Sequence, residues 1–157
     1  MGSKFPKGKK VYTTIPIQKY NLLMKYRNLL VRDNSNKKLD MDFLIKSSNC
    51  NNEYIIKIKY DNIYDIPKVF VLSPELNTRP NEAIPHTYGM HKVYGKEYLQ
   101  ICPFYPKEDW CNKLIIADTV LLWSIEWFYF YELWLVSGIW SGRRDTSRTR
   151  KARKIKI

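Results

Sequence analysis

The sequence predicts an α+β fold: an N-terminal helix, an antiparallel meander sheet of about four strands, and aromatic helices at the C-terminal end. Three observations carry this prediction. Apolar residues at helical spacing open the chain, segments of alternating apolar and polar residues follow, and a long aromatic stripe comes near the end. With 157 residues, 45% of them hydrophobic and 15% aromatic, the chain is long enough for one domain with a proper core.

The first helix is predicted over residues 16–31, where apolar residues recur at intervals of three, four or six positions and basic residues lie between them. These apolar residues are Ile17, Tyr20, Leu23, Met24 and Leu30. The polar cluster at 32–36 predicts a turn after the helix.

Strands are predicted next, over residues 39–47, 53–60 and 67–74. The first two alternate between apolar and polar side chains, with residues 48–52 as a hairpin connection in which Cys50 is incidental. The third is bounded by Pro67 and Pro74. A short apolar run at 98–101 then predicts a further strand.

The segment 84–110 holds the residues best suited to take part in a chemical reaction. It contains both histidines, His86 and His91, and it contains Cys102 directly after the apolar run. Pro103 and Pro106 follow, and proline cannot donate to a sheet, so Cys102 is expected to close a strand and face the loop after it. A thiol at such a junction is more accessible than one inside a core.

After Trp110 the pattern is helical, because aromatic and apolar residues recur at intervals of three, four and seven. They are Ile116, Val120, Trp123, Trp127, Phe130 or Tyr131, and Trp134. Asp118 and Thr119 are candidates to cap the helix start, and Gly138 would let the chain turn.

Residues 119–140 have the length of a membrane span, but Glu126 and Glu132 favour a buried aromatic helix.

The formal charge of +12 lies almost wholly at the two ends. Residues 1–10 hold four lysines and no acid, and residues 143–157 hold eight basic residues and one acid, which leaves +1 for the rest. We therefore divide the chain into a basic arm at 1–14, a domain at 15–142 and a basic tail at 143–157. Such ends suit non-specific contact with nucleic-acid phosphates, and the plain alternative is a solvated terminus.

Three cysteines, Cys50, Cys102 and Cys111, follow no metal-binding or disulfide spacing. No apolar segment of a signal peptide follows the basic start, so we expect a cytoplasmic protein. Cys111 lies beside Trp110 and is expected to be a packed structural thiol.

The order of helix, meander, proline-bounded strand, histidine and strand-ending cysteine resembles a ubiquitin-conjugating enzyme. Residues 66–74 resemble its third strand, 99–102 the strand leading to its cysteine, and Trp110 its tryptophan eight residues later. His86 matches the histidine of its His-Pro-Asn motif, while Thr87 and Tyr88 replace the proline and the asparagine.

A narrower resemblance is to the stand-alone prokaryotic ubiquitin-conjugating-like proteins of bacterial anti-phage (CBASS) operons, which are encoded beside a cGAS-like nucleotidyltransferase. It covers roughly residues 16–142. Its residues are Pro85-His86-Thr87-Tyr88, Cys102 with Tyr105-Pro106, Ala117-Asp118-Thr119, Trp123, Glu126-Trp127, Tyr131-Glu132, Trp134 and Gly138-Ile139-Trp140.

The resemblance implies acyl transfer through a thioester on Cys102, from the C-terminus of the cognate nucleotidyltransferase to an acceptor amine. It implies no metal and no cofactor. The oxyanion donor is either the hydroxyl of Tyr88 or backbone N–H groups, and His86 holds the loop or acts as a base. Asp118 and Thr87 are secondary candidates, Asp118 either to orient the amine or to cap the helix.

Two other interpretations are weighed against this one. A papain-type protease would place its cysteine at a helix start with the histidine far downstream, whereas both histidines here precede Cys102. A catalytically silent adaptor that binds the nucleotidyltransferase, or nucleic acid through the tail, is favoured by the missing asparagine and the basic tail.

Overall fold

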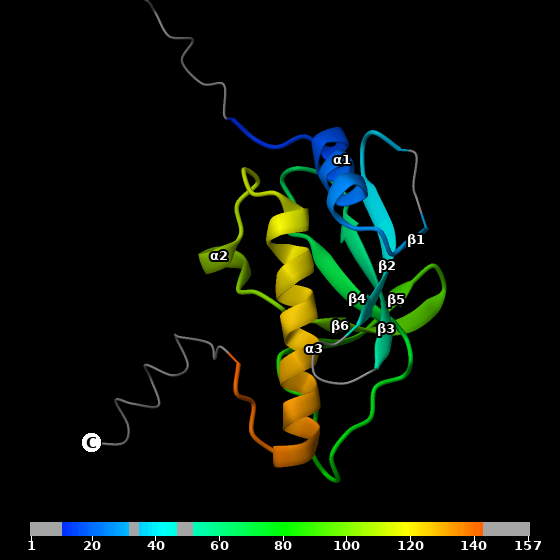
Figure 1. Cartoon of the computed structure of the whole chain (residues 1–157), viewed down its shortest axis with the longest axis vertical. Helices are drawn as coiled ribbons and strands as arrows, with labels where there is room; N and C mark the ends of the chain where they lie inside the picture. The colour runs from blue at the N-terminus through cyan, green and yellow to red at the C-terminus, as the bar shows by residue number, and fades with distance from the viewer. Residues whose placement is uncertain (1–10, 32–34, 47–51, 143–157) are drawn as a thin grey trace, which may run out of the picture.

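The computed structural model describes residues 11–31, 35–46 and 52–142, and it has helices on one side of a sheet (Figure 1). The long helix α3 crosses one face of the sheet, and α1 lies beside the upper end of α3 in this view. The elements in order are α1 (Ile15–Lys25), β1 (Leu29–Val31), β2 (Leu39–Lys46), β3 (Glu53–Tyr60), β4 (Lys68–Ser73), β5 (Thr87–Val93), β6 (Lys96–Ile101), α2 (Pro106–Asp109), the 3-10 turn η1 (Ile116–Asp118) and α3 (Val120–Ser137).

The sheet has six strands in the order β1-β2-β3-β4-β6-β5, and each neighbouring pair is antiparallel. The predicted strands at 39–47, 53–60 and 67–74 correspond to β2, β3 and β4, with ends that differ by at most one residue. The predicted α+β class is therefore right, but the expected number of about four strands is too low, because β1 and β5 were not predicted as strands.

The first helix ends earlier than predicted, at Lys25 rather than at residue 31. Tyr26 has extended backbone angles, and its hydroxyl donates to the carbonyl of Leu44 on β2. Residues 29–31 then pair with β2 as a short edge strand. The predicted helix was too long because Leu30 was counted as part of the helical stripe, although it lies on this strand.

The face of α1 that packs on the domain also differs from the prediction. Ile17, Tyr20 and Met24 are exposed, whereas Leu22 and Gln18 are fully buried. The Gln18 amide donates to the carbonyl of Leu114, and its oxygen accepts from the backbone N–H of Ile116. This polar side chain is satisfied only at the segment that leads into α3, which fixes the helix with Gln18 inward.

The segment around the histidines, where only residues 98–101 were predicted as a strand, is a β-hairpin of β5 and β6. Its turn is formed by Tyr94 and Gly95, whose φ angles are +50° and +83°. A two-residue turn with two positive φ angles matches the right-handed twist of the strands on either side, and it usually needs glycine or asparagine at the first position. Tyr94 is an unusual residue at that position, so the hairpin signal in the sequence is weak.

Tyr94 instead contacts a buried charge cluster on the sheet face opposite α3. Lys57 of β3 lies 2.5 Å from Asp40 and 2.6 Å from Asp42 of β2, and all three side chains are largely buried. The Tyr94 hydroxyl donates to Asp40, and Lys57 lies 5.6 Å from the centre of the Tyr94 ring. The turn of the hairpin is thereby fastened to β2 and β3.

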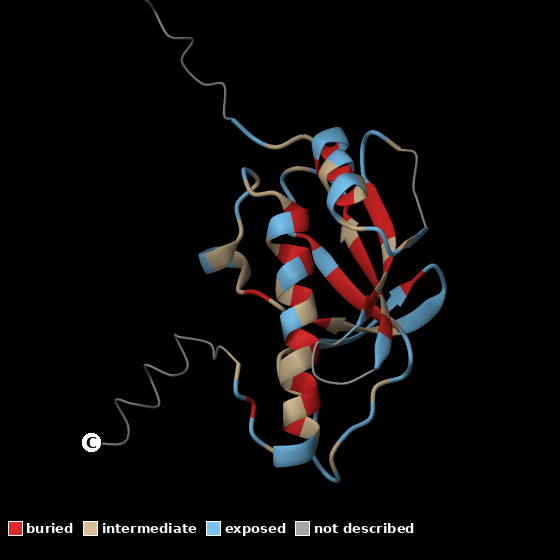
Figure 2. Cartoon of the chain, viewed as in Figure 1, coloured by how far each residue is buried: buried red, intermediate tan, exposed pale blue. Residues whose placement is uncertain are grey.

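The hydrophobic core lies between the sheet and α3 (Figure 2). The predicted aromatic stripe divides into two sets of residues. The first set packs in this core, and the second set, Trp123 and Phe130, is only partly buried. The core set comprises Ile116, Val120, Trp127, Tyr131 and Trp134. Glu132 is buried as well, and it accepts hydrogen bonds from the Tyr54 hydroxyl and the Asn52 amide. No helix in the described part of the chain is long and apolar enough to cross a membrane.

The start of α3 does not use the predicted side-chain caps. Thr119 occupies the N-cap position, but its hydroxyl donates backwards to the carbonyl of Ile115. Asp118 forms an ion pair with Lys25 of α1 at 2.7 Å instead. At the other end, the prediction for Gly138 is right: it adopts φ +75° and turns the chain back along α3. The basic arm at 1–10, Cys50 and the tail at 143–157 lie outside the described residues.

Candidate active site

Cys102 follows β6 directly, as predicted from the two prolines after it, and it is partly exposed. Its sulfur lies 3.2 Å from the hydroxyl oxygen of Tyr88 and 3.3 Å from the carbonyl oxygen of Phe104. The thiol can donate to either oxygen, whereas a thiolate would accept from the Tyr88 hydroxyl. The sulfur therefore lies at the surface with a hydroxyl group in direct contact.

A β-bulge places Tyr88 beside the cysteine. Thr87 of β5 pairs with Ile101 of β6, and the next pair is Gly89 with Gln100. Between these two pairs β5 advances by two residues and β6 by only one. Tyr88 is the extra residue, and Gly89 takes up the bend with φ +80°. A bulge changes the direction of a side chain locally. The Tyr88 hydroxyl thus reaches Cys102, which directly follows the neighbouring strand.

The phenol of Tyr88 is held in its neutral form. Burial raises the pKa of Tyr88 well above its ordinary value, and the hydrogen bond with Cys102 raises it further. A neutral phenol keeps its O–H and can donate a hydrogen bond to a negative atom formed at the sulfur. The backbone carbonyl of Tyr88 is fixed as well, since it lies 2.8 Å from Nε2 of His91.

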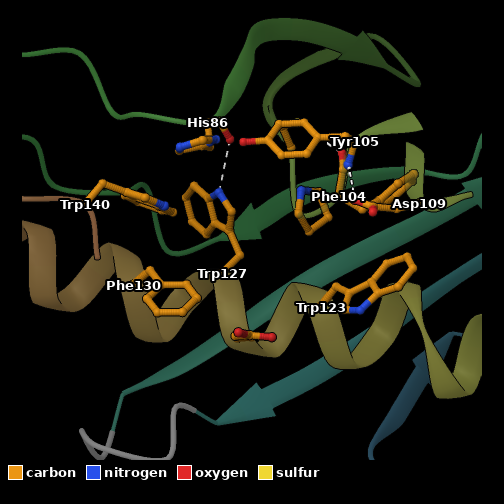
Figure 3. A pocket seen from close by; sticks show the side chains of 11 residues that line it. His86, Phe104, Tyr105, Asp109, Trp123, Trp127, Phe130 and Trp140 are labelled. Carbon is orange, nitrogen blue, oxygen red and sulfur yellow. Dashed lines mark hydrogen bonds between the residues drawn. The ribbon is translucent and has the colours of Figure 1, made fainter. Parts of the chain in front are cut away.

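His86 acts on the site through its backbone carbonyl. This oxygen accepts the backbone N–H of Cys102 at 2.8 Å and the indole N–H of Trp127 at 3.0 Å (Figure 3). It therefore ties the segment before β5 both to the cysteine and to α3. His86 itself has φ +53°, which costs a non-glycine residue free energy that surrounding contacts must offset.

The side chains of His86 and Thr87 support the same turn. The imidazole ring packs on Trp140, with ring centres 5.0 Å apart, and it faces Tyr105 at 6.3 Å. The Thr87 hydroxyl donates to the carbonyl of Ile84 at 3.4 Å. Trp140 reaches this position because the chain turns back after Gly138.

Two cavities share Pro103 and Phe104 in their linings, and Cys102 lines the first of them. The first, which we call the aromatic cavity, has a volume of about 170 Å³ and lies between α3 and the segment around α2 (Figure 3). In that view Trp123, Trp127 and Phe130 come from α3, and Trp140, His86 and Tyr105 lie on the opposite side. It is lined by His86, Cys102, Pro103, Phe104, Tyr105, Asp109, Trp123, Glu126, Trp127, Phe130 and Trp140.

The second cavity, which we call the strand-edge cavity, has a volume of about 200 Å³ and lies on the other side of Pro103. Tyr88 lines it together with apolar residues, and Lys68 is its charged member. Its lining is Ile66, Pro67, Lys68, Tyr88, Gln100, Ile101, Pro103, Phe104 and Pro106. Cys102 thus lines the aromatic and acidic cavity, and its partner Tyr88 lines the neighbouring apolar cavity that holds a lysine.

The structure brings Cys102, Tyr88, His86 and Thr87 together, but it places Asp118 elsewhere. Asp118 lines neither cavity and is paired with Lys25. Cys111 is exposed, so the expectation that it packs beside Trp110 is wrong; Trp110 packs edge-on against Tyr60 without covering it. In the described part of the chain, no group of three His, Cys, Asp or Glu side chains could hold a metal ion.

Sequence reasoning did not foresee four of the residues that shape the site. Asp109 caps the turn before α2 by accepting the backbone N–H of Tyr105 at 2.8 Å. His91 fixes the carbonyl of Tyr88, and Glu126 and Trp127 reach the cavity from α3. Asp109 had a local signal, because it is an acid three residues after Pro106 in a short helical turn. His91, Glu126 and Trp127 were named in the sequence analysis, but without a role in the site.

The indole N–H of Trp127 is expected to hold the cysteine segment closed. In Trp127→Phe, loss of this hydrogen bond should lower the local free energy of opening by about 1 kcal/mol, which corresponds to roughly fivefold faster alkylation of Cys102. Iodoacetamide labelling read by peptide mass spectrometry measures the rate at each cysteine separately.

Trp123→Phe is the matched control, because within the described residues the Trp123 indole makes no hydrogen bond although it lines the same cavity. It should leave the Cys102 rate nearly unchanged. Equal acceleration by both substitutions would show that ring volume, rather than the bond to His86, controls access.

Comparison with known proteins agrees with this geometry. A family model described as Type II CBASS E2 protein matches residues 18–147. The comparison with curated proteins gives no match. The matched region begins within α1, includes the sheet, Cys102 and α3, and continues past the end of α3. The chain therefore belongs to the Type II CBASS E2 family, the E2-like proteins of bacterial anti-phage systems.

Proposed function

We propose that this protein is a transferase that carries an acyl group as a thioester on Cys102. The observation that carries the proposal is the position of the sulfur: it is partly exposed, 3.2 Å from a neutral phenol, and at the wall of the aromatic cavity. A thiolate is a strong nucleophile, and a thioester remains reactive toward amines. Membership of the CBASS E2 family supports the same chemistry.

The donor in this proposal is the C-terminal residue of the cognate cGAS-like nucleotidyltransferase. In the first step the Cys102 sulfur attacks the activated carbonyl carbon, a C–S bond forms and the activating group leaves. In the second step an amine attacks the same carbon, a C–N bond forms and Cys102 leaves as the thiolate. Conjugation would then regulate anti-phage cyclic-nucleotide signalling.

The carbonyl oxygen becomes negative in both steps and needs a hydrogen-bond donor. The Tyr88 hydroxyl contacts the sulfur, so an acyl carbon on that sulfur would bring its oxygen within reach of the phenol. His86 is assigned a positioning role through its carbonyl, and Thr87 supports the same turn. The ion pair with Lys25 gives Asp118 a structural function, and its orientation of an amine stays a prediction.

Tyr88→Phe is expected to slow transfer while keeping the ring in place. A hydrogen bond to a charged atom contributes roughly 1.5–3 kcal/mol, so the rate should fall about 10- to 150-fold. Because the pKa of Tyr88 is raised, the phenol stays protonated, and this factor should be constant between about pH 7 and about pH 10. Single-turnover discharge of the thioester at several pH values measures it.

Tyr98→Phe on the same hairpin is the control, since Tyr98 lines neither cavity. A Tyr88→Phe rate within twofold of the wild type would leave backbone N–H groups as the oxyanion donors. If the rate difference between wild type and Tyr88→Phe disappears with rising pH, Tyr88 ionises in that range, which would contradict its raised pKa.

The proposal as a whole is tested by intact-mass measurement of the chain co-expressed with its cGAS-like nucleotidyltransferase. We expect an adduct that combines both masses and that a thiol reductant removes, with peptide mapping to Cys102. Absence of any adduct, together with phage protection that does not need Cys102, would favour the silent adaptor instead.

A further inference from the structure

The aromatic cavity has the chemistry of a site for an organic cation. Its walls are the rings of tryptophan, tyrosine, phenylalanine and histidine, and its charged members are two carboxylates, Asp109 and Glu126. Among the described residues that line it there is no lysine and no arginine. Aromatic faces and carboxylates both attract alkylammonium groups, and the rings also accept the methylene chain that carries the charge.

The two carboxylates are in different situations. Asp109 already accepts the backbone N–H of Tyr105, so it is engaged in holding the wall. Glu126 is exposed on α3 one residue before Trp127, and within the described part of the chain its carboxylate forms no hydrogen bond or ion pair. A negative group at the cavity, with rings on both sides, is available to a positively charged ligand.

The strand-edge cavity has the opposite character. Its charged member is Lys68, and the rest of its lining is mostly apolar, with the Tyr88 ring beside Cys102. A cation would be repelled there, whereas a neutral or acidic peptide segment would not. The cavity that Cys102 lines and the neighbouring cavity that Tyr88 lines therefore differ in charge. Two different substrates must approach the sulfur, which the Tyr88 hydroxyl contacts.

From this asymmetry we infer that the aromatic cavity receives the acceptor, as a lysine-type alkylammonium group held by Glu126, and that the strand-edge cavity receives the donor peptide. This inference rests on the proposed thioester chemistry and specifies which side each substrate uses. Glu126 is a binding residue in it. The bound ammonium loses one proton to water, the neutral amine attacks the acyl carbon, the C–S bond breaks to release the Cys102 thiolate, and the second N–H proton also passes to water.

Binding is tested first, on the full chain without any acyl group. The tryptophan fluorescence of the protein is titrated with N-acetyl-lysine methylamide and with N-acetyl-norleucine methylamide, which lacks the charge but keeps most of the chain. We expect the lysine compound to bind about fivefold tighter, and Glu126→Gln to remove the difference. Glu75→Gln, on an exposed loop away from the cavity, should preserve it. Equal affinity for the two compounds, or an unchanged preference in Glu126→Gln, overturns the assignment.

Discharge is tested second. Cys102 is acylated by exchange with a small-molecule acetyl thioester, and the loaded protein is treated with cadaverine or with hydroxylamine, which is uncharged at neutral pH. Glu126→Gln should raise the half-saturating cadaverine concentration about fivefold, with the maximal rate and the hydroxylamine rate unchanged. Equal slowing of both nucleophiles contradicts a charge-binding role.

The two failures are distinguishable. If Cys102 accepts no acyl group in the exchange, the proposed thioester chemistry fails whatever the cavity binds. If Cys102 is acylated but neither experiment shows a preference for the charged amine, Cys102 remains the nucleophile and only the assignment of the cavities is wrong.

Discussion

Replacement of Cys102 by alanine is expected to abolish the covalent adduct with the nucleotidyltransferase and to remove phage protection that depends on it. Among the described residues, Cys102 is the thiol that contacts the Tyr88 hydroxyl and lines the aromatic cavity. Loss of a nucleophile removes the covalent pathway entirely, with an expected decrease of more than about a thousandfold. Intact mass of the co-expressed proteins and plaque counts measure the two effects.

Cys111 provides the matched control for this substitution. It is more exposed than Cys102, so non-specific acylation or oxidation of an accessible thiol would fall on it first. Cys111→Ala should keep the adduct and the protection. Cys102→Ser should accumulate an oxyester that resists thiol reductants, because an alkoxide is a poorer leaving group than a thiolate. An adduct that persists in Cys102→Ala but is lost in Cys111→Ala would show that Cys111, and not Cys102, is the nucleophile.

Lys57→Met is expected to lower the free energy of unfolding by about 3–5 kcal/mol. The substitution leaves Asp40 and Asp42 buried without their counter-charge, although it approximately keeps the length of the side chain. Urea unfolding followed by far-UV circular dichroism measures the loss. Lys59→Met is the control, because Lys59 is less buried, lies over the Tyr94 ring at 5.4 Å and forms no ion pair within the described residues, although its charge also acts on Asp40. Its cost should stay below about 1 kcal/mol.

The pH dependence separates the lost ion pairs from lost packing. Burial by itself would raise the pKa of Asp40, but hydrogen bonds from Lys57 and Tyr94 outweigh it and lower that pKa below its ordinary value. A lowered folded-state pKa gives stability above the ordinary pKa of about 4, which disappears as the pH falls through the folded value. In Lys57→Met the unpaired carboxylates gain from protonation. The difference between variant and wild type should therefore shrink below about pH 5, whereas a pure packing defect would stay constant.

The sequence was most informative where local chemistry leaves little choice. Pro103 forbids continuation of the ladder, so the end of β6 and the accessible position of Cys102 were predictable. The pair of prolines around β4 and the alternation in β2 and β3 were equally clear. In each case a single residue or a strict period determines the backbone.

Contacts between distant segments were not predictable in this way. Gln18 decides the buried face of α1 only because Leu114 and Ile116 supply its partners, almost a hundred residues later. Apolar spacing alone favoured Ile17, Tyr20 and Met24, which are exposed. The hydrogen bond from Trp127 to the His86 carbonyl likewise forms only when α3 packs on the sheet, so neither residue indicates it in the sequence.

The irregular pairing at Tyr88 has a consequence for recombination between related chains. Side chains on a strand alternate between the two faces, so gain or loss of one residue between His86 and Gly89 would turn a different side chain toward the sulfur. A chimaera that exchanges this hairpin must therefore conserve the residue count from His86 to Cys102, even where it changes the residues themselves.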